Sequence, residues 1–293
     1  MKLADGYTLM HEHIHIDLSS VKNDSDCHLD CIDETIKEFK KLYEYGVRNI
    51  VEVTNLGMGR NLEIIEKVEK ATGIQIIKST GCYKEPFIPE KYLNMGSEQL
   101  ADVMIQEIEN GFDDFDDKAN MIGEIGTSKD EWKESERRLF DAAILAHKKT
   151  GKPIYTHTTL STLAKQQAEY LVSNGVDPKK VVIGHVDLSD DFDYILSVLE
   201  TGVFVGFDTI GKENYLPDAK RIQYLLQLEK LGKINQIVLS EDLTRKSHLK
   251  YKGGIGYAYL FETFIPRLKE AGIKETSINQ MLIHNPRIIL EDE

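Results

Sequence analysis

Short, mostly apolar runs alternate with longer amphipathic stretches eight times along the chain. The first run is "YTLMHEHI" (7–14), followed by an amphipathic stretch around 31–45, and the last is "NQIVLSED" (235–242), followed by 255–271. The runs are rich in β-branched residues and apolar on both faces, as buried parallel strands are. Eight strand-then-helix units predict an α/β fold, a (β/α)8 TIM barrel. The alternative is an open doubly wound sheet, which the lack of a Gly-rich loop after the first run disfavours.

The six middle units follow the same order of strand and helix. We expect strands at 47–53, 74–81, 120–126, 152–158, 180–186 and 202–208, and helices at 61–71, 97–110, 134–149, 162–174, 189–200 and 218–230. No Pro- or Ser-rich linker divides the chain, so residues 1–293 are expected to form a single (β/α)8 domain. The stretch 277–293 is expected to be a helical tail on the exterior of the barrel.

Charge and cysteine content limit the partners of the chain. The formal net charge is −13, which disfavours nucleic acid and anionic membranes as partners. No apolar run is long enough for a membrane span, and the N-terminus enters the first strand pattern without a signal-peptide region, so a cytoplasmic location is expected. The three cysteines (Cys27, Cys31 and Cys82) make a disulfide framework improbable. "DCHLDC" (26–31) is interpreted as a surface loop, with a metal knuckle as the alternative.

Residues of metal-ligand type lie at or near the ends of the predicted strands. They are His11, His13, Glu124, His157, His185 and Asp242. In a (β/α)8 barrel the chemistry lies at the C-terminal ends of the strands. Buried imidazoles and carboxylates must be paired or must ligate something. Four imidazoles and two carboxylates can hold two divalent ions that share one carboxylate.

Each of these residues also has an ordinary structural explanation. A single strand histidine is more often a hydrogen-bonded core residue than a ligand. Glu124 alone could be an ion-paired core carboxylate, and Asp242 alone could be an N-cap. The six together favour the metal site. His15, two residues after His13, is interpreted as a hydrogen-bonding residue at the lip of the site, because the ligand set is complete without it. Glu12 is expected to point outward, towards the helix layer.

At these residues the sequence resembles a known family. "GYTLMHEH", "EIGTS", "THT", "IGH" and "LSED" occur in the order found in the phosphotriesterase-like branch of the amidohydrolase superfamily, and the resemblance is closest to the phosphotriesterase homology protein subgroup. It covers essentially the whole chain. It implies a binuclear metal site in which His11, His13 and Asp242 hold the more buried ion, His157 and His185 hold the more exposed one, and Glu124 bridges the two.

The bridging position separates this chain from the namesake enzymes. Phosphotriesterases bridge their metals with a carbamylated lysine, whereas this subgroup and this chain have a glutamate, so organophosphate hydrolysis does not follow from the family name. The resemblance implies a metal-bridging hydroxide as nucleophile. Asp242 is expected to take the proton after attack and pass it to the leaving oxygen.

The loops around the predicted site suggest the substrate. "DTIGKENY" (208–215) contains Lys212, and "TRKSHLKYK" (244–252) contains Arg245 and His248 among several basic residues. We expect Lys212, Arg245 and His248 to bind a phosphate monoester, with a solvated loop as the alternative. Tyr83 in "TGCYKE" matches the tyrosine near the site in lactonases of the wider family. Thr209 stands where many of those lactonases have an arginine, which puts acyl-homoserine lactones in doubt.

The sequence therefore predicts a metal-dependent hydrolase of ester bonds, and the resemblance favours a phosphorylated sugar lactone as its small-molecule substrate. The alternatives are a carboxylesterase or phosphotriesterase acting on neutral esters, and a non-catalytic barrel that binds a metal or metabolite. Zinc suits the ligands, and manganese and cobalt remain alternatives. Barrels often dimerise through their loops, and the sequence leaves a homodimer open.

Overall fold

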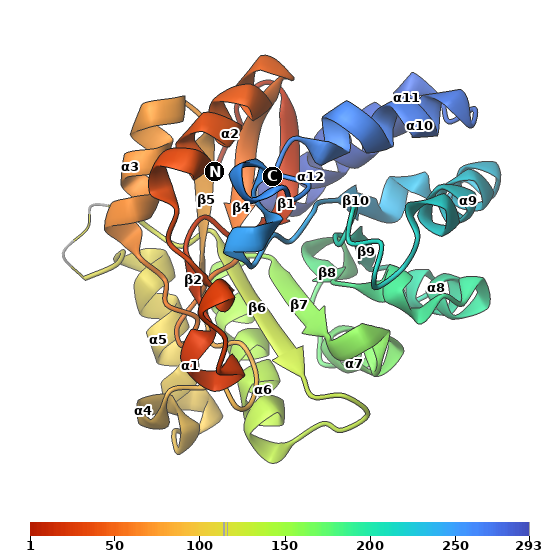
Figure 1. The fold of residues 1–293 in the computed structure, drawn as a ribbon. Coiled ribbons are helices and arrows are strands. Elements are labelled where there is room, and N and C mark those ends of the chain that lie inside the picture. Colours follow the sequence, from red (N-terminus) through yellow and green to blue (C-terminus); the bar gives the residue numbers. More distant parts are fainter. Residues whose placement is uncertain (114, 116, 293) are drawn as a thin grey trace.

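The computed structural model describes residues 1–113, 115 and 117–292. Among these, eight parallel strands form one sheet with helices around it, which confirms the predicted barrel (Figure 1). In sheet order the strands are β1 (Tyr7–Glu12), β4 (Val47–Glu52), β5 (Gln75–Thr80), β6 (Met121–Thr127), β7 (Ile154–Thr158), β8 (Val181–Ile183), β9 (Phe204–Phe207) and β10 (Ile237–Leu239).

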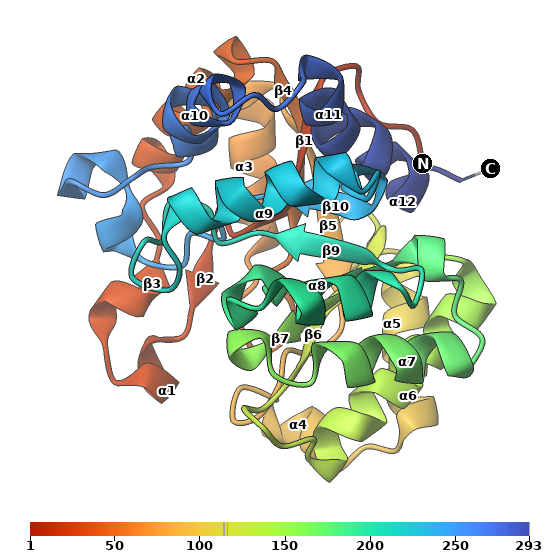
Figure 2. The ribbon, with the colours of Figure 1, turned by 90° about the vertical axis from the view of Figure 1, so that its right-hand side faces the viewer.

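The helices of the barrel lie outside the strands (Figure 2). They are α2 (Ile32–Glu44), α3 (Leu62–Thr72), α5 (Ser97–Glu109), α6 (Glu134–Thr150), α7 (Ala164–Ser173), α8 (Phe192–Leu199), α9 (Asp218–Lys230) and α10 (Ile265–Glu270), the last preceded by a π-helical segment, Leu260–Phe264. The short helix α4 (Glu90–Leu93) follows β5. Lysines in the last turn and a left-handed Gly151 end α6, as "HKKTGKP" predicts.

Several strands are shorter than the sequence predicts, and three of them place polar residues beyond their ends. The runs 180–186, 202–208 and 235–242 are strands only as far as Ile183, Phe207 and Leu239. The polar residues at the ends of these runs therefore stand in the first turns beyond the strands. His185 and Asp242 have left-handed backbones, with φ of 60° and 52°, which is incompatible with a continuing strand.

Two clusters of buried apolar side chains form the core. The larger lies between the strands and the helices. The smaller fills the barrel and includes Met10, Val51, Tyr155 and Val238. The sequence places the C-terminal tail on the barrel exterior, and this is corrected in part. The tail comprises α11 (Glu275–Asn279), a π-helical segment (Gln280–His284) and α12 (Asn285–Leu290), and the last two residues of α12, Ile289 and Leu290, join the inner cluster. The two termini lie side by side, and the N-terminal ammonium contacts Asp292 (Figures 1 and 2).

Side chains join β1 to β10 across the seam of the barrel. The backbone N–H of His11 donates to Ser240 Oγ (2.8 Å), and that of Glu241 donates to Glu12 Oε1 (2.8 Å). Glu12 and Glu241 are fully buried, and Glu241 Oε1 in turn accepts from the N–H of Leu260 (3.0 Å). The carboxylate of Glu12 thus has the backbone of the last strand unit as its partner.

The connection after β1 is an excursion towards the C-terminal end of the barrel. It contains β2 (Ile16–Asp17), helix α1 (Ser19–Lys22) and β3 (His28–Leu29), and β2 pairs antiparallel with β3. Cys27 is buried there, and the Cys31 thiol contacts the Tyr251 hydroxyl (3.0 Å). Within the described residues, neither cysteine belongs to a group of potential metal ligands.

Candidate metal centre

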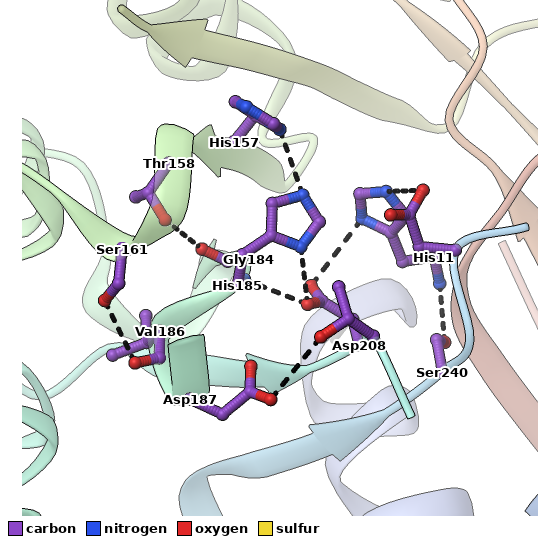
Figure 3. Close-up of polar contacts among 12 residues, drawn as sticks. His11, His157, Thr158, Ser161, Gly184, His185, Val186, Asp187, Asp208 and Ser240 are labelled. Atoms are coloured by element: carbon purple, nitrogen blue, oxygen red, sulfur yellow. Dashed lines mark hydrogen bonds and ion pairs between the residues drawn. The ribbon is translucent and has the colours of Figure 1, made fainter. Parts of the chain in front are cut away.

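The structure brings together the six residues that the sequence predicts as metal ligands. His11, Glu124 and His157 lie in β1, β6 and β7, and His13, His185 and Asp242 follow β1, β8 and β10 within three residues. Figure 3 shows the rings of His11, His157 and His185 close to one another. All six side chains are buried or nearly so.

The shortest distances group the six residues into two sets that share Glu124, and the ligand atoms of His11, His185 and Asp242 also lie within 4.8 Å of one another. In the first set Asp242 Oδ1 lies 3.6 Å from His11 Nε2 and 3.2 Å from His13 Nε2. Glu124 Oε2 lies 3.7 Å from His11 Nε2, and Glu124 Oε1 lies 3.6 Å from His13 Nε2. In the second set Glu124 Oε2 lies 3.3 Å from His157 Nδ1 and 3.9 Å from His185 Nε2, and these two ring nitrogens are 2.9 Å apart.

These side chains fit a pair of divalent cations. Ligand atoms about 2.0 to 2.2 Å from one tetrahedral ion lie about 3.3 to 3.6 Å apart, close to the spacing in both sets. Among the described residues, both ring nitrogens of His11, His13 Nε2 and Glu124 Oε2 are buried without a hydrogen-bond partner. Buried polar atoms are almost always paired, so four unpaired atoms in one place indicate that a ligand completes them.

Two of these side chains, those of His185 and Asp242, stand on residues with a left-handed backbone conformation. A left-handed conformation costs a residue other than glycine about 1 kcal/mol or more, and both His185 and Asp242 adopt it at the ends of their strands. Such conformations persist where the surroundings enforce them, and they concentrate at functional sites. Here the turn that ends each strand brings the side chain to the other ligands.

The electrostatics of the cluster also suit cation binding. Burial alone would raise the pKa of Glu124, but the surrounding histidines, His11 first, hold it at about 2. Burial lowers the pKa of His157 to about 4, although Glu124 beside it acts in the opposite direction. An ionised Glu124 and a neutral His157 are the forms that bind metal.

Asp208 is a buried carboxylate of the site that the sequence analysis does not select. Its Oδ1 accepts from the backbone N–H of His185 (2.9 Å) and contacts His185 Nδ1 (2.7 Å), and its Oδ2 accepts from the Tyr155 hydroxyl (2.7 Å) (Figure 3). Burial would lower the pKa of His185, but Asp208 raises it to about 9. Gly206 leaves room for this contact, since a Cβ there would lie 2.3 Å from Asp208 Oδ2. A carboxylate on the far nitrogen of a ligating histidine fixes the ring and increases its basicity.

Other buried polar residues hold the first histidines. His13 Nδ1 contacts Thr54 Oγ1 (2.7 Å), and Glu52 accepts from the backbone N–H groups of Ile14 and Thr54. His15 Nδ1 contacts the carbonyl of Gly59 (2.8 Å). His15 is in none of the groups of potential ligands found among the described residues.

A cavity of about 210 Å³ opens onto five of the six side chains, and His11 lies behind its lining. Of the predicted substrate-binding residues, Tyr83, Lys212 and Arg245 line it. The Tyr83 hydroxyl lies 3.0 Å from His157 Nε2, and Lys212 Nζ lies 2.5 Å from Asp242 Oδ2. His248 is outside the lining. Its Nδ1 accepts from the N–H of Thr244 (3.2 Å), and burial, followed by the charge of Lys212, lowers its pKa to about 4. At neutral pH His248 is therefore uncharged.

Aspartates from the excursion after β1 neutralise much of the basic loop 244–252. Arg245 Nη1 lies 2.6 Å from Asp24 Oδ2 and 3.7 Å from Asp26 Oδ2, and Lys246 Nζ lies 2.7 Å from Asp30 Oδ1. The loop is thus held against the excursion by ion pairs.

Arg221 anchors the loop that carries Lys212. Its guanidinium is fully buried and donates to Asp187 Oδ2 (2.6 Å), Asp218 Oδ1 (2.9 Å), Thr209 Oγ1 (2.8 Å) and the carbonyl of Leu216. Asp218 Oδ1 also accepts from the N–H of Gly211 (3.1 Å). The Thr209 hydroxyl is therefore occupied by the buried Arg221, and the loop is fixed on both sides of Lys212.

Comparisons with known proteins agree with the fold and with the cluster. The family model described as the phosphotriesterase family matches residues 2–290. The chain is 46% identical to the phosphotriesterase homology protein of Escherichia coli over 96% of both chains. It is 33% identical to an aryldialkylphosphatase of Saccharolobus solfataricus (96% of this chain, 94% of the relative). It is 31% identical to a phospho-furanose lactonase of Mycoplasmopsis synoviae (88% and 80%).

Solved structures match over the whole barrel. The phosphotriesterase homology protein of Escherichia coli, described as complexed with phosphate in the active site, superposes with a TM-score of 0.95 at 45% identity and covers 98% of this chain and 99% of its own. A lactonase from Listeria monocytogenes superposes with a TM-score of 0.92 at 28% identity (98% and 95%). In the described part of the chain, every helix is too short or too polar to cross a bilayer.

Proposed function

The chain belongs to the phosphotriesterase family, whose members are metal-dependent hydrolases, and within that family we propose that it opens the ring ester of a phosphorylated sugar lactone. One observation carries the proposal. A single cavity is lined both by five of the six potential metal ligands, all except His11, and by cationic side chains that suit an anionic substrate, in a chain with a net charge of −13. The phospho-furanose lactonase and the phosphate-bound relative support the same substrate class.

The six candidate ligands can be assigned to two metal ions. His11, His13 and Asp242 would bind one divalent cation, His157 and His185 the other, and Glu124 both, with zinc as the proposed metal and manganese or cobalt as alternatives. Bound there, the cations would supply a Lewis acid for the substrate carbonyl and would lower the pKa of water to near neutrality.

Asp242 is the proposed proton acceptor. Burial would raise its pKa, but Lys212 and the neighbouring histidines hold the pKa well below its usual range, so the carboxylate is ionised, which is the form that a proton acceptor requires. Its Oδ1 faces His11 and His13, and its Oδ2 accepts from Lys212. Because Lys212 contacts this carboxylate, it can also orient it towards the leaving oxygen.

Tyr83 is proposed to orient the substrate. Burial raises the pKa of its hydroxyl well above the usual value, so it remains a hydrogen-bond donor. It lies 3.0 Å from His157 Nε2 and lines the cavity, where it can donate to an oxygen of the lactone.

A paired substrate screen tests the proposal. Ribonolactone with and without a phosphate on its terminal hydroxyl would be compared by kcat/KM, and the phosphorylated form should be the better substrate by a wide margin. Equal rates for the two lactones would refute the substrate class. Asp242→Asn should retain most of the bound metal and lose most of the turnover. If both survive, the role of Asp242 as proton acceptor is wrong.

The second candidate is hydrolysis of neutral esters, as a carboxylesterase or phosphotriesterase. The apolar part of the cavity lining (Leu18, Met58, Phe87, Leu160 and Leu188) and the aryldialkylphosphatase relative favour it. It predicts that neutral aryl esters or phosphotriesters are turned over faster than any phosphorylated lactone, so the same screen separates the two candidates.

A further inference from the structure

Four cationic side chains line the cavity, and they differ in their partners. Arg245 is paired with Asp24 and Asp26, and Lys212 is paired with Asp242. Lys22 and Lys84 also line the cavity. Within residues 1–113, 115 and 117–292 neither makes an ion pair, and the only hydrogen bond found for the Lys84 ammonium is to the carbonyl of Glu85 (3.3 Å).

Lys22 and Lys84 lie against the same aromatic ring. Lys22 is the last residue of α1, and Lys84 follows Tyr83 in the loop after β5. Each ammonium lies 5.7 Å from the centroid of the Phe87 ring, which lines the same cavity. Two like charges beside one ring and without a carboxylate partner repel each other, and an anion bound between them would relieve that repulsion.

The metal centre is close to this pair. Burial lowers the pKa of the Lys84 ammonium, the charge of Lys22 acts in the same direction, and Glu136 and Glu124 oppose them. The influence of Glu124 indicates that Lys84 lies within electrostatic reach of the metal centre. Tyr83, the residue before Lys84, contacts His157. An anionic group bound by Lys84 would therefore belong to a molecule that also reaches the six ligands.

The charges decide between the two candidate subsites. Arg245 with Asp24 and Asp26 carries a net charge of −1, and Lys212 is held in contact with Asp242, whose carboxylate it orients. An anion that binds there must compete with carboxylates already in contact. Lys22 and Lys84 together carry +2, which matches the charge of about −1.5 to −2 on a phosphate monoester at neutral pH.

We propose that Lys22 and Lys84, with the ring of Phe87 beside them, form the subsite that binds the phosphate of the substrate. This proposal rests on the proposed function for the identity of the substrate, and it replaces Arg245 and His248 as the residues that select for the phosphate. Arg245 then has the structural task of holding the loop 244–252 against the excursion after β1.

The test uses the metal-loaded enzyme and two measurements. The first is the ratio of kcat/KM for ribonolactone phosphate to that for ribonolactone, and the second is the inhibition constant of inorganic phosphate. Lys22→Met and Lys84→Met should each lower the ratio and weaken the inhibition by about tenfold or more, as expected for loss of one charge-assisted contact. The ribonolactone rate and the metal content should stay near those of the wild type, and Lys84→Arg should retain most of the ratio.

The matched control is Lys91→Met. Lys91 also lies over an aromatic ring, 5.1 Å from the centroid of Tyr92, but it is outside the cavity lining, so its substitution should change neither measurement. Arg245→Met is the competing variant, and it should lower the ratio by less than Lys84→Met does.

The outcomes separate this proposal from the proposed function. If Arg245→Met removes the preference for the phosphorylated lactone and the two lysine variants keep it, the subsite is wrong and the proposed function stands. If the wild type treats both lactones alike, the proposed function fails, and phosphate inhibition alone judges the subsite. About tenfold weaker inhibition in Lys84→Met would then support the subsite, and unchanged inhibition would overturn it.

Discussion

Asp208→Asn tests whether the carboxylate behind His185 tunes the metal centre. Asp208 makes three close contacts, to the backbone N–H of His185 (2.9 Å), to His185 Nδ1 (2.7 Å) and to the hydroxyl of Tyr155 (2.7 Å). Asparagine has the same size, and its carbonyl oxygen can keep both contacts to His185. Its amide group would replace Oδ2 next to Tyr155, whose hydroxyl can accept as well as donate. The substitution therefore removes a charge and preserves most of the geometry.

The expected effect is on metal affinity. Loss of a carboxylate behind a ligating histidine typically lowers metal affinity by about 10- to 100-fold, which is about 1.4 to 2.7 kcal/mol. The loss should concentrate on the ion of His157 and His185, because His185 touches Asp208 directly. His11 Nδ1 is 3.7 Å from Asp208 Oδ2, so the other ion should be affected less.

The assay is a zinc titration against a competing chelator, with metal content measured after equilibrium dialysis. Wild type should bind two ions, and Asp208→Asn should lose one of them at a chelator strength that leaves the wild type loaded. Asp190→Asn is the control, because Asp190 accepts from the Tyr224 hydroxyl and contacts none of the six ligands. If Asp208→Asn binds both ions as tightly as the wild type, the inference that Asp208 increases metal affinity is wrong.

Three further predictions concern stability and His15. Arg221→Met should destabilise the fold by about 3 to 5 kcal/mol in denaturant unfolding, because it leaves the buried Asp187 without its cation and removes the closer of the two cations of the buried Asp218. The exposed Lys220→Met should stay within about 0.5 kcal/mol. His248 has a pKa of about 4 in the fold, against about 6.5 for a histidine in the unfolded chain. Between these pH values the unfolded chain binds a proton that the fold does not, so stability falls as the pH drops through this window. His248→Asn should remove up to about 3 kcal/mol of that acid sensitivity in unfolding measured from pH 7 to 4, and an unchanged pH profile would contradict this. His15→Asn should keep both metal ions in the dialysis assay, and loss of one would make His15 a ligand.

The barrel could be predicted because its signal is repeated. Each strand is apolar on both faces and each helix is amphipathic, so an error of a few residues at one element does not alter the count of eight units. The ends of the strands could not be predicted, because apolar residues continue up to the turn. Ile183 and His185 differ in backbone conformation, but "VVIGHV" shows no break.

The six ligand candidates were predictable from their place at the strand ends, but the residues that support them were only partly so. Asp208 ends an apolar run in the same way as Asp242, so the rule that selects one also selects the other. Tyr155 could not be selected, since a tyrosine in a buried strand suits a core equally well. Its hydroxyl meets Asp208 only after strands β7 and β9 are placed on either side of β8.

The residues that attract an anion to the cavity are harder still to predict from the sequence. The run 244–252 is the densest basic segment at the predicted site, and the sequence favours it for binding phosphate. Aspartates about 220 positions earlier neutralise it, as the pairs of Arg245 with Asp24 and Lys246 with Asp30 show. Lys22 and Lys84 are isolated lysines in the sequence and give no signal there. Since attraction for an anion depends on charges that lack a partner, two isolated lysines can contribute more than a basic run, and the comparison of Lys84→Met with Arg245→Met measures that difference directly.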